Sequence, residues 1–568
     1  MAKKTKDSNL SIEERLEQAL IPNWDEPYKL PPNWCWTKLE SIAKWGSGGT
    51  PSRKNPEYYI GNIPWIKTGE LDNAYIYDTE EHISEKALAN SSAKLFPINT
   101  VVIAMYGATI GKVGIMGIEA TTNQACACAV SSSAIDYKYL FYYAISQRDA
   151  FIGKGKGGAQ PNISQDIIKQ HEIPLPPLAE QRRIVAHIES FFAKLDEAKE
   201  KAQEVVDGFE TRKAAILHKA FSGELTEKWR KENTPAPACE YLEELKNDDN
   251  YSIRSEIKYW NNESLPAGWC ESKIGNLLYF AGRIGWKGLK AEEYTASGPL
   301  LLSVYNLNDG DEVTYNRVYH ITQERYEESP EIMVEIGDVL LTKDGAGIGK
   351  LGYVKELPEK ATINSSLLLL RPSKSAVSKY IYYVLLGPAL QSIVKERITG
   401  SATPHLFQRD IKEFVLPIPS LEEQIEIVRI LDNMLLNENK AKESAELVLE
   451  QIDVIKKSIL VRAFRGELGT NDPTEASAIE LIKQIVEEKI KAEESKPKRT
   501  QTKRKEVGFV AKTILEVLKF SEKLTPEKLK AETSLEVDDF YDQLKVLIDN
   551  GQIREIRIEG ESYLEAVK

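Results

Sequence analysis

The chain contains a second, diverged copy of much of its own sequence, and this duplication limits the possible folds more than any other feature. The segment AILHKAFSGEL (215–225) returns as SILVRAFRGEL (458–468), with seven of eleven positions identical. PLPPLAEQ (174–181) returns as PIPSLEEQ (417–424), in the same order along the chain. A period of about 240 residues is much longer than that of a solenoid repeat. We therefore expect two similar heads, suited to a ligand with two similar parts.

Length and composition are those of a multidomain globular protein. The 568 residues predict about three to four domains, with 42% hydrophobic and 28% charged residues. No apolar run is long enough to cross a membrane, and no apolar stretch follows the basic N-terminus, so the sequence predicts a cytoplasmic protein. The net charge of −12 argues mildly against a stand-alone nucleic-acid binder. It remains compatible with a subunit whose binding surface is locally basic.

Each half is expected to begin with a mixed α+β head. The heads open with LPPNWCW (30–36) and LPAGWCE (265–271) and extend over 30–173 and 265–416. Short apolar runs within them read as strands separated by glycine-rich turns. Such a scaffold, with irregular strands and long loops, suits the display of contact residues.

A long helix is predicted to follow each head, over 174–225 and 417–468. Ser420 and Glu423 have the spacing of a capping box, and Pro177 stands where the first helix begins. Gly223 and Gly466 are placed to end the helices in a left-handed conformation.

Both helices carry a seven-residue apolar repeat in the same register, interrupted by lysines at matching positions. This pattern predicts an antiparallel coiled-coil spacer, about 65 Å long if each helix runs unbroken over some 44 residues. Two independent amphipathic helices remain the alternative. The repeat positions are Val185, Ile188, Phe192, Leu195, Lys199, Ala202, Val206, Phe209, Lys213, Ile216 and Ala220, matched by Val428, Leu431, Leu435, Glu438, Lys442, Ala445, Leu449, Ile452, Lys456, Ile459 and Ala463.

The remaining segments surround these two units. The third helix expected in the C-terminal module (536–549) carries five carboxylates (Glu536, Asp538, Asp539, Asp542 and Asp549) and one lysine, Lys545, which favours docking to protein over contact with DNA. A basic linker at 496–505 is the better candidate for touching DNA. The segments are an N-terminal helical segment (1–29), a connector (226–264), a helical segment with the basic linker (469–506), and a winged-helix-like module (507–568) of three helices and a hairpin.

No catalytic or metal-binding constellation emerges. NPEY (55–58) only partly matches the tetrapeptide with which amino-methyltransferases hold a target amine. GATIGKVG (107–114) and GAGIGKLG (345–352) lack the full phosphate-loop pattern and read as tight turns between strands; loops that approach DNA, with Lys112 and Lys350 on phosphates, are the alternative. The five cysteines form no CxxC pair, and Cys126 and Cys128 read as small buried strand residues.

The order of motifs resembles the specificity subunit of type I restriction–modification enzymes. IPWIKTGEL (63–71), YGATIGKVG (106–114), TNQAC (122–126) and QPNISQDIIK (160–169) are similar to motifs of its target recognition domains. The resemblance covers about 30–470. The second head departs from it more, with SVYNL at 303–307 and PHLFQRD at 404–410.

The resemblance implies a DNA-recognition subunit without chemistry of its own. Each head would read one half of an asymmetric, interrupted site on double-stranded DNA, while the spacer would set the gap. Two modification (methyltransferase) subunits would bring S-adenosylmethionine, and two restriction (ATP-dependent translocase and endonuclease) subunits would bring ATP and Mg; this chain would hold no cofactor. An intrinsic methyltransferase or nuclease, or a coiled-coil protein with no DNA role, are the competing interpretations.

Polar residues in the loops of the two heads are the candidate DNA contacts. Several of them, notably Thr109 and Asn123, could equally cap tight turns. The candidates are Arg53, Lys67, Thr68, Thr109, Lys112, Asn123, Gln160 and Asn162 in the first head, and Ser303, Asn306, Lys343, Lys350, Asn364, His405 and Gln408 in the second.

Overall fold

The structure is a computed structural model in which the chain divides into two compact units, Met1–Ile485 and Val486–Lys568. Among the described residues, no helix is long and apolar enough to cross a membrane. The predicted basic linker, Gln160 and Glu536 lie outside them. The structure describes residues 11–22, 25–156, 161–246, 259–260, 264–283, 289–307, 312–345, 347–372, 374, 376–399, 405–494, 514–520, 523–533, 535, 537–558 and 561–567.

The first head is built on a five-stranded sheet whose central strands are buried on both faces. Strand β6 (Val101–Ala104) reads VVIA and is fully buried, because helix α4 (Tyr137–Ser146) covers one side. In β9 (Cys126–Ser131), the two alanines face the core that contains α4, while Cys126 and Cys128 face a second, smaller core. The predicted structural role of these cysteines is confirmed. The sheet order is β2 (Ala43–Ser47), β9, β6, β7 (Val113–Met116) and β4 (Tyr75–Ile76).

Two smaller sheets complete this head. Strand β3 (Ile63–Ile66) lies between β5 (His82–Ile83) and β8 (Thr121–Thr122), and it runs parallel to β8. Strand β1 (Cys35–Lys38) pairs antiparallel with β10 (Glu172–Leu175), so the beginning and end of the head lie side by side.

The second head repeats this arrangement, as the duplicated sequence predicts. Its main sheet has the order β13, β19, β16, β17, and helix α12 (Ser378–Leu386) packs on it as α4 does in the first head. The strands are β13 (Leu278–Ala281), β19 (Leu367–Pro372), β16 (Val339–Thr342) and β17 (Leu351–Tyr353) in this sheet; β15 (Tyr319–His320), β14 (Thr295–Leu302) and β18 (Ala361–Ile363) in the second; and β11 (Tyr259–Trp260), β12 (Cys270–Lys273) and β20 (Val415–Ile418) in the third.

Both glycine-rich motifs are hairpin turns, as predicted. The first connects β6 to β7, and the second connects β16 to β17, with antiparallel pairing on either side of each turn. Gly111 and Gly349 adopt positive φ angles of 73° and 85° in these turns, a conformation that glycine permits.

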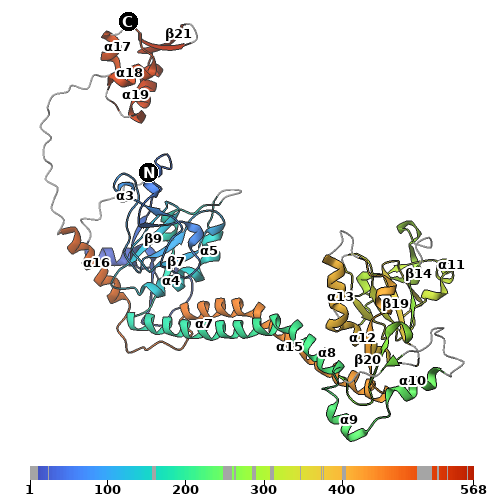
Figure 1. The fold of residues 1–568 in the computed structure, drawn as a ribbon. Helices are drawn as coiled ribbons and strands as arrows, with labels where there is room; N and C mark the ends of the chain where they lie inside the picture. Colours follow the sequence, from blue (N-terminus) through green and yellow to red (C-terminus); the bar gives the residue numbers. More distant parts are fainter. Residues whose placement is uncertain are drawn as a thin grey trace. The chain divides into compact units, whose positions relative to one another are not determined.

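The two arms pack against each other and run antiparallel (Figure 1). The N-terminal part of α7 (Leu178–Asp207) belongs to the first head's core, and the end of α8 (Phe209–Phe221) belongs to the second head's core. Helix α15 (Leu421–Phe464) begins in the second core and ends in the first. Each arm therefore connects the same two cores in opposite directions.

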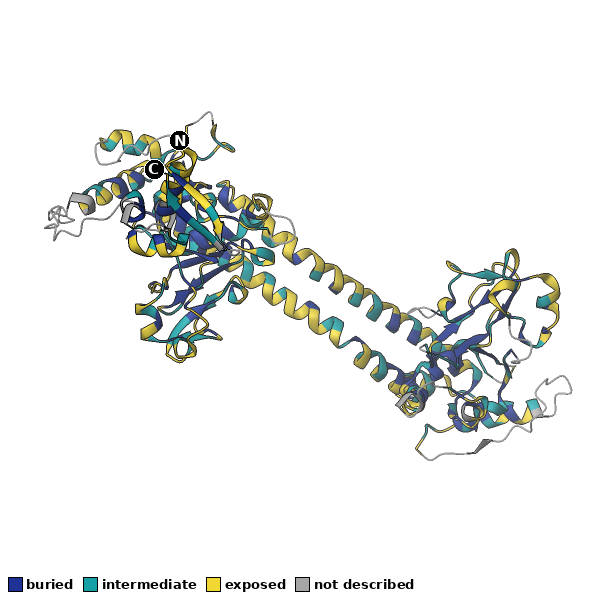
Figure 2. Ribbon diagram, turned by 90° about the horizontal axis from the view of Figure 1, so that it is seen from above, coloured by how far each residue is buried: buried dark blue, intermediate teal, exposed yellow. Residues whose placement is uncertain are grey.

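The heptad prediction agrees with the burial of the arms (Figure 2). Of the predicted repeat positions, only Lys199 is exposed. Ion pairs join the two arms along the seam, Arg212 with Glu438 at 2.8 Å and Lys456 with Asp196 at 2.5 Å. Gly223 and Gly466 have φ angles of 76° and 72°, which confirms their role in ending the helices.

The prediction of an unbroken first arm needs a correction at Gly208. This residue separates α7 from α8, although the backbone hydrogen bonds continue across it, from Gly208 N to Glu204 O and from Arg212 N to Gly208 O. The Arg212 guanidinium bends back over the glycine and donates to the Val205 carbonyl at 2.7 Å. A side chain at position 208 would collide with that guanidinium, because a Cβ there would lie 2.4 Å from it.

The second unit has the element order of a winged helix, in agreement with the prediction. Strands β21 (Ile553–Ile558) and β22 (Glu561–Ala566) form the hairpin, and Leu524 makes a further bridge to Leu564. The core includes Val517, Leu529 and Phe540 from the three helices. These helices are α17 (Ile514–Phe520), α18 (Pro526–Thr533) and α19 (Val537–Asp549).

Candidate nucleic-acid interface

The candidate residues of the first head gather at one end of its sheets. Lys67 and Asn123 follow the paired parallel strands β3 and β8, and Asn123 N donates to the Ile66 carbonyl at 3.0 Å. The β6–β7 turn lies beside them, since Met105 N donates to the Ala125 carbonyl. Asn162 bridges to Tyr106 of the same turn. Loops from four parts of the chain thus meet at this edge.

The basic side chains of the first head are held by carboxylates. Arg53 and Lys67 share Glu81, at 2.7 and 3.2 Å, and the Arg53 guanidinium lowers the pKa of the Glu81 carboxyl. Lys112 lies 3.9 Å from Asp72. Because these ion pairs are partly exposed, each contributes little to stability. The basic side chains can therefore exchange them for contacts to phosphate.

The second head assembles its candidates in the same way. Asn364 N donates to the Leu302 carbonyl at the end of β14 and β18, as Asn123 does to Ile66. Leu406 N donates to the Lys343 carbonyl, which brings His405 and Gln408 to the β16–β17 turn. Gln408 begins helix α14 (Gln408–Lys412), and Lys350 ends the turn.

Two candidates of the second head are internal, which argues against the DNA contacts predicted for them. Asn306 is fully buried, accepts from Ser303 N at 2.8 Å, and donates to the carbonyls of Thr314 and Arg317. Ser303 is 7% exposed, and its hydroxyl lies 3.3 Å from the Asn306 amide oxygen. In the first head, Glu70 accepts from Lys67 N in the same way. Sequence alone does not distinguish such a buried cap from a loop amide.

Three further candidates are engaged in turns but keep exposed surface. Thr109 donates to the Tyr106 carbonyl at 2.7 Å, and the side-chain oxygens of Asn123 and Asn364 each accept from the backbone N–H two residues on. The alternative of turn caps is thus correct for their local role. Thr68 begins a short 3₁₀ turn (Thr68–Glu70).

Asn162 and His405, both predicted from the sequence, occupy equivalent positions; the sequence did not predict that the backbone of each would pair with a residue of the glycine-rich turn. In the first head, Tyr106 bridges to Asn162; in the second, Asp344 bridges to His405. Tyr106 is 41% exposed, while Asp344 accepts a hydrogen bond from the His405 ring. The comparison of GATIGKVG with GAGIGKLG marks this position, because a tyrosine precedes the first copy and an aspartate the second.

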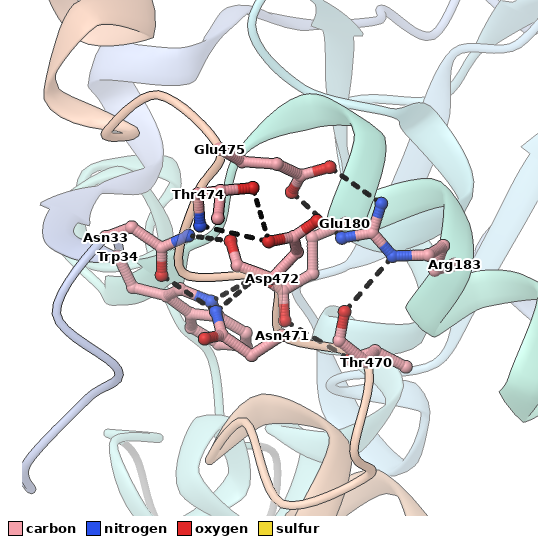
Figure 3. A network of polar contacts seen from close by, with 9 residues as sticks. All are labelled: Asn33, Trp34, Glu180, Arg183, Thr470, Asn471, Asp472, Thr474 and Glu475. Atoms are coloured by element: carbon pink, nitrogen blue, oxygen red, sulfur yellow. Dashed lines mark hydrogen bonds and ion pairs between the residues drawn. The ribbon is translucent and has the colours of Figure 1, made fainter.

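In each head, a buried carboxylate contacts the segment that follows the C-terminal end of the arm arriving from the other head. At the first head, Glu180 is fully buried and accepts from Trp34 Nε1 at 2.8 Å, from Thr470 Oγ1 and from Asn471 Nδ2 (Figure 3). Arg183 beside it forms a two-pronged ion pair with Glu475 at 2.8 Å.

The second head has the same junction with one change. Glu423 accepts from Trp269 Nε1 at 2.9 Å and from Thr226 Oγ1 at 2.7 Å, and it also pairs with the Arg230 guanidinium. Ser420 caps α15 as predicted, but the Glu423 side chain turns into this junction instead of closing the predicted capping box. The first arm therefore ends on the second head, and the second arm ends on the first.

The outer face of α15 carries an apolar stripe. Five exposed side chains recur at intervals of eleven or seven residues, which places them within about 40° of one another around the helix. They are Ile425, Leu436, Leu447, Val454 and Val461, each at least 48% exposed. A helix of this kind fits a partner helix.

Comparison with known proteins agrees with this organisation. The model of the type I restriction modification DNA specificity domain matches residues 31–206 and 269–449. The chain is 27% identical over 467 residues to the type I restriction enzyme MjaIX specificity subunit of Methanocaldococcus jannaschii, covering 78% of this chain and 95% of that protein. It is 24% identical to the EcoKI specificity subunit of Escherichia coli strain K12, covering 78% and 90%.

A solved structure supports the fold. The crystal structure of the HsdS subunit from Thermoanaerobacter tengcongensis superposes with a TM-score of 0.53 at 20% identity, over 78% of this chain and all of that chain. The matches of the family model fall on the two heads and the adjoining arms, and they end before the winged-helix unit. By its duplicated heads, its paired arms and these matches, the chain belongs to the family of type I restriction–modification DNA specificity subunits.

Proposed function

We propose that this chain reads an asymmetric, interrupted DNA sequence, with one head on each half-site and the paired arms setting the gap. The proposal rests on one observation: the two heads have the same scaffold but different residues at the turn. These residues are Tyr106 and Asn162 in the first head, and Asp344 and His405 in the second. Two similar scaffolds that carry different residues at their turns are suited to two different half-sites.

The arms have a length suited to this role. From Ile188 in the first core to Ile216 in the second, the helical path is about 42 Å at 1.5 Å per residue. That is somewhat more than the roughly 34 Å of one turn of B-DNA, the usual unit of half-site spacing.

The proposed complex contains two modification subunits and two restriction subunits, which supply S-adenosylmethionine, ATP and Mg; the chain itself performs no chemistry. We assign the docking of partner helices to the apolar stripe of α15. A net charge of −12 fits a subunit whose partners supply much of the contact to DNA phosphates.

Methyl transfer from labelled S-adenosylmethionine tests this assignment. The purified chain is expected to transfer none, and addition of the cognate modification subunit is expected to restore transfer to adenine in target DNA. Turnover by the chain alone would make it an enzyme. Failure to shift target DNA, with or without that subunit, would favour a purely structural coiled-coil protein.

The spacer is tested separately by inserting four residues after the buried Ala202. This insertion breaks the heptad register, so it should change the gap or abolish binding while both half-site sequences stay the same. A rewritten half-site would exclude the arms as the ruler.

We propose a docking role for the winged-helix unit. A cavity of about 490 Å³ lies between α17 and α19, lined by Leu515, Asp542, Val546 and their neighbours. Exposed Val546 lies one turn from Asp542 on α19, so the cavity has an apolar wall with a carboxylate at its edge, which suits a protein partner better than DNA phosphates. Deleting residues 507–568 should leave the methylated sequence unchanged and weaken assembly; an altered sequence would mean that this unit reads bases.

A further inference from the structure

A cavity of about 670 Å³ lies where the first arm reaches the second head. Its walls come from α8 and α15 on one side, and from α12, α13 (Pro388–Thr399) and the β16–β17 turn on the other. Helix α8 packs against both α12 and α13 (Figure 1). The apolar part of the wall includes Phe209, Leu217, Ile348 and Tyr382.

Positive charge dominates the rim of this cavity. Four lysines line it, and Glu210 is the one carboxylate among the described lining residues. Lys442 and Lys213 lie over the ring of Phe209, at 4.9 and 6.0 Å from its centroid, and Lys442 is 3.9 Å from Glu446. The lysines are Lys213, Lys350, Lys395 and Lys442.

The first head provides an internal comparison, because the same helical positions occur there with compensating carboxylates. Lys456, the counterpart of Lys213, donates to Asp196 at 2.5 Å. Lys457, on the same helix, lies 3.5 Å from Asp149.

At the second head, the arm position that matches Asp196 carries no carboxylate. Asn439, a neutral amide that lines the cavity, stands where Asp196 stands in the first arm. Ala214 stands where Lys457 stands and leaves the space open. The copy at the second head thus lacks, opposite Lys213, the carboxylate that pairs with the equivalent Lys456 at the first head.

We propose that this cavity binds a phosphate group of a nucleotide, either a free nucleotide or one within a DNA strand. Lysine ammonium groups are suited to phosphate, and the volume and the aromatic wall leave room for the attached nucleoside. A free nucleotide would add an effector site to the specificity subunit. A nucleotide of the DNA strand would deepen the proposed function, by adding a sequence-independent anchor beside the second head.

The decisive variant is Asn439→Asp, which restores in the second head the carboxylate found at Asp196. It is nearly isosteric, so the fold is expected to tolerate it. Asn437→Asp is the matched control, because residue 437 is exposed, two positions away on the same helix, and outside the cavity lining. Lys442→Gln is a second variant that removes positive charge without adding a carboxylate.

Two titrations of the full chain distinguish the two sources of phosphate. Calorimetry with ATP, and with inorganic pyrophosphate, measures a free ligand in the absence of DNA. A gel shift with target duplex over a range of salt concentrations, without nucleotide, measures the DNA strand. A carboxylate within several ångströms of a phosphate should weaken binding by about tenfold or more in Asn439→Asp, and Lys442→Gln should act in the same direction.

If the variants lose affinity only for ATP and pyrophosphate, the ligand is a free nucleotide. If they lose affinity only for DNA, with a shallower salt dependence, the ligand is a nucleotide of the DNA strand. If Asn439→Asp matches Asn437→Asp in both titrations, the proposal is overturned. The methylated sequence in cells is expected to stay the same in every variant. Failure of the wild-type complex to methylate any defined sequence would instead count against the proposed function.

Discussion

The two heads share the buried junctions with the arms, around Glu180 and Glu423, and differ at the glycine-rich turns, where the candidate DNA contacts lie. At the junctions, Trp34 and Trp269 donate to equivalent buried glutamates, and both glutamates accept from a threonine at the end of the opposite arm. At the glycine-rich turns, the same backbone bridge joins Tyr106 to Asn162 in one head and Asp344 to His405 in the other. The duplicated residues hold the molecule together, whereas the diverged residues lie where a ligand can be read.

The junctions differ in one respect that should have a large effect on stability. Glu423 neutralises the Arg230 guanidinium in a buried setting, whereas Glu180 accepts only from neutral donors. Glu423→Gln leaves that cation unpaired and should cost about 3–5 kcal/mol of unfolding free energy. Glu180→Gln should cost about 1–2 kcal/mol.

Urea unfolding of the two variants, followed by hydrogen exchange in each head, measures this difference. The loss should be confined to the head whose junction is changed. Equal losses would show that Arg230 adds nothing to the second junction.

The heads should also differ in their response to acid. His171 of the first head accepts from Lys154 Nζ at its Nδ1 atom and donates from Nε2 to Gln147, and burial together with Lys154 lowers its pKa from 6.5 to about 4. In the second head, Phe414 occupies the matching position.

Because the unfolded chain binds the His171 proton more tightly, the first head loses stability as the pH falls below 6.5. The loss should reach about 2 kcal/mol at pH 5. His171→Phe should remove this dependence between pH 4 and 6.5 in hydrogen-exchange measurements of the first head. A dependence that persists in the variant would assign it to other groups.

A smaller effect is expected at the candidate interface of the first head. Glu81 pairs with Arg53 and shares Lys67 with Glu80, so Glu81→Gln should free Arg53, leave Lys67 paired with Glu80, and tighten DNA binding by about threefold at low salt. Glu57→Gln is the control, because Glu57 pairs with Lys86 at 2.9 Å in the same head. Equal effects of the two variants on the dissociation constant would reflect net charge alone.

Periodicity and repetition made most of the scaffold predictable. The heptads, the terminal glycines Gly223 and Gly466, and the hairpin turns follow from local patterns, and each is found in the structure. The break at Gly208 was not predicted, because the apolar register continues through it.

The candidate interface was less predictable, because burial and pairing depend on the assembled fold. Asn306 reads like any loop amide, yet it is an internal cap of a turn. The buried role of Glu180 and Glu423 depends on a tryptophan far away in the sequence and on the end of the other arm. The sequence signals for this buried role are the tryptophan and the glutamate–glutamine pair, which recur in both halves.

The most direct test of the account is methylome sequencing of cells that express the complete methyltransferase with residues 30–165 exchanged for the head of another family member. The unmodified complex should methylate one bipartite sequence with a fixed gap. The exchange should replace one half-site and leave the other half-site and the gap unchanged, because the arms and the second head are untouched. A change in both half-sites would contradict the central claim that each head reads its own part of the DNA.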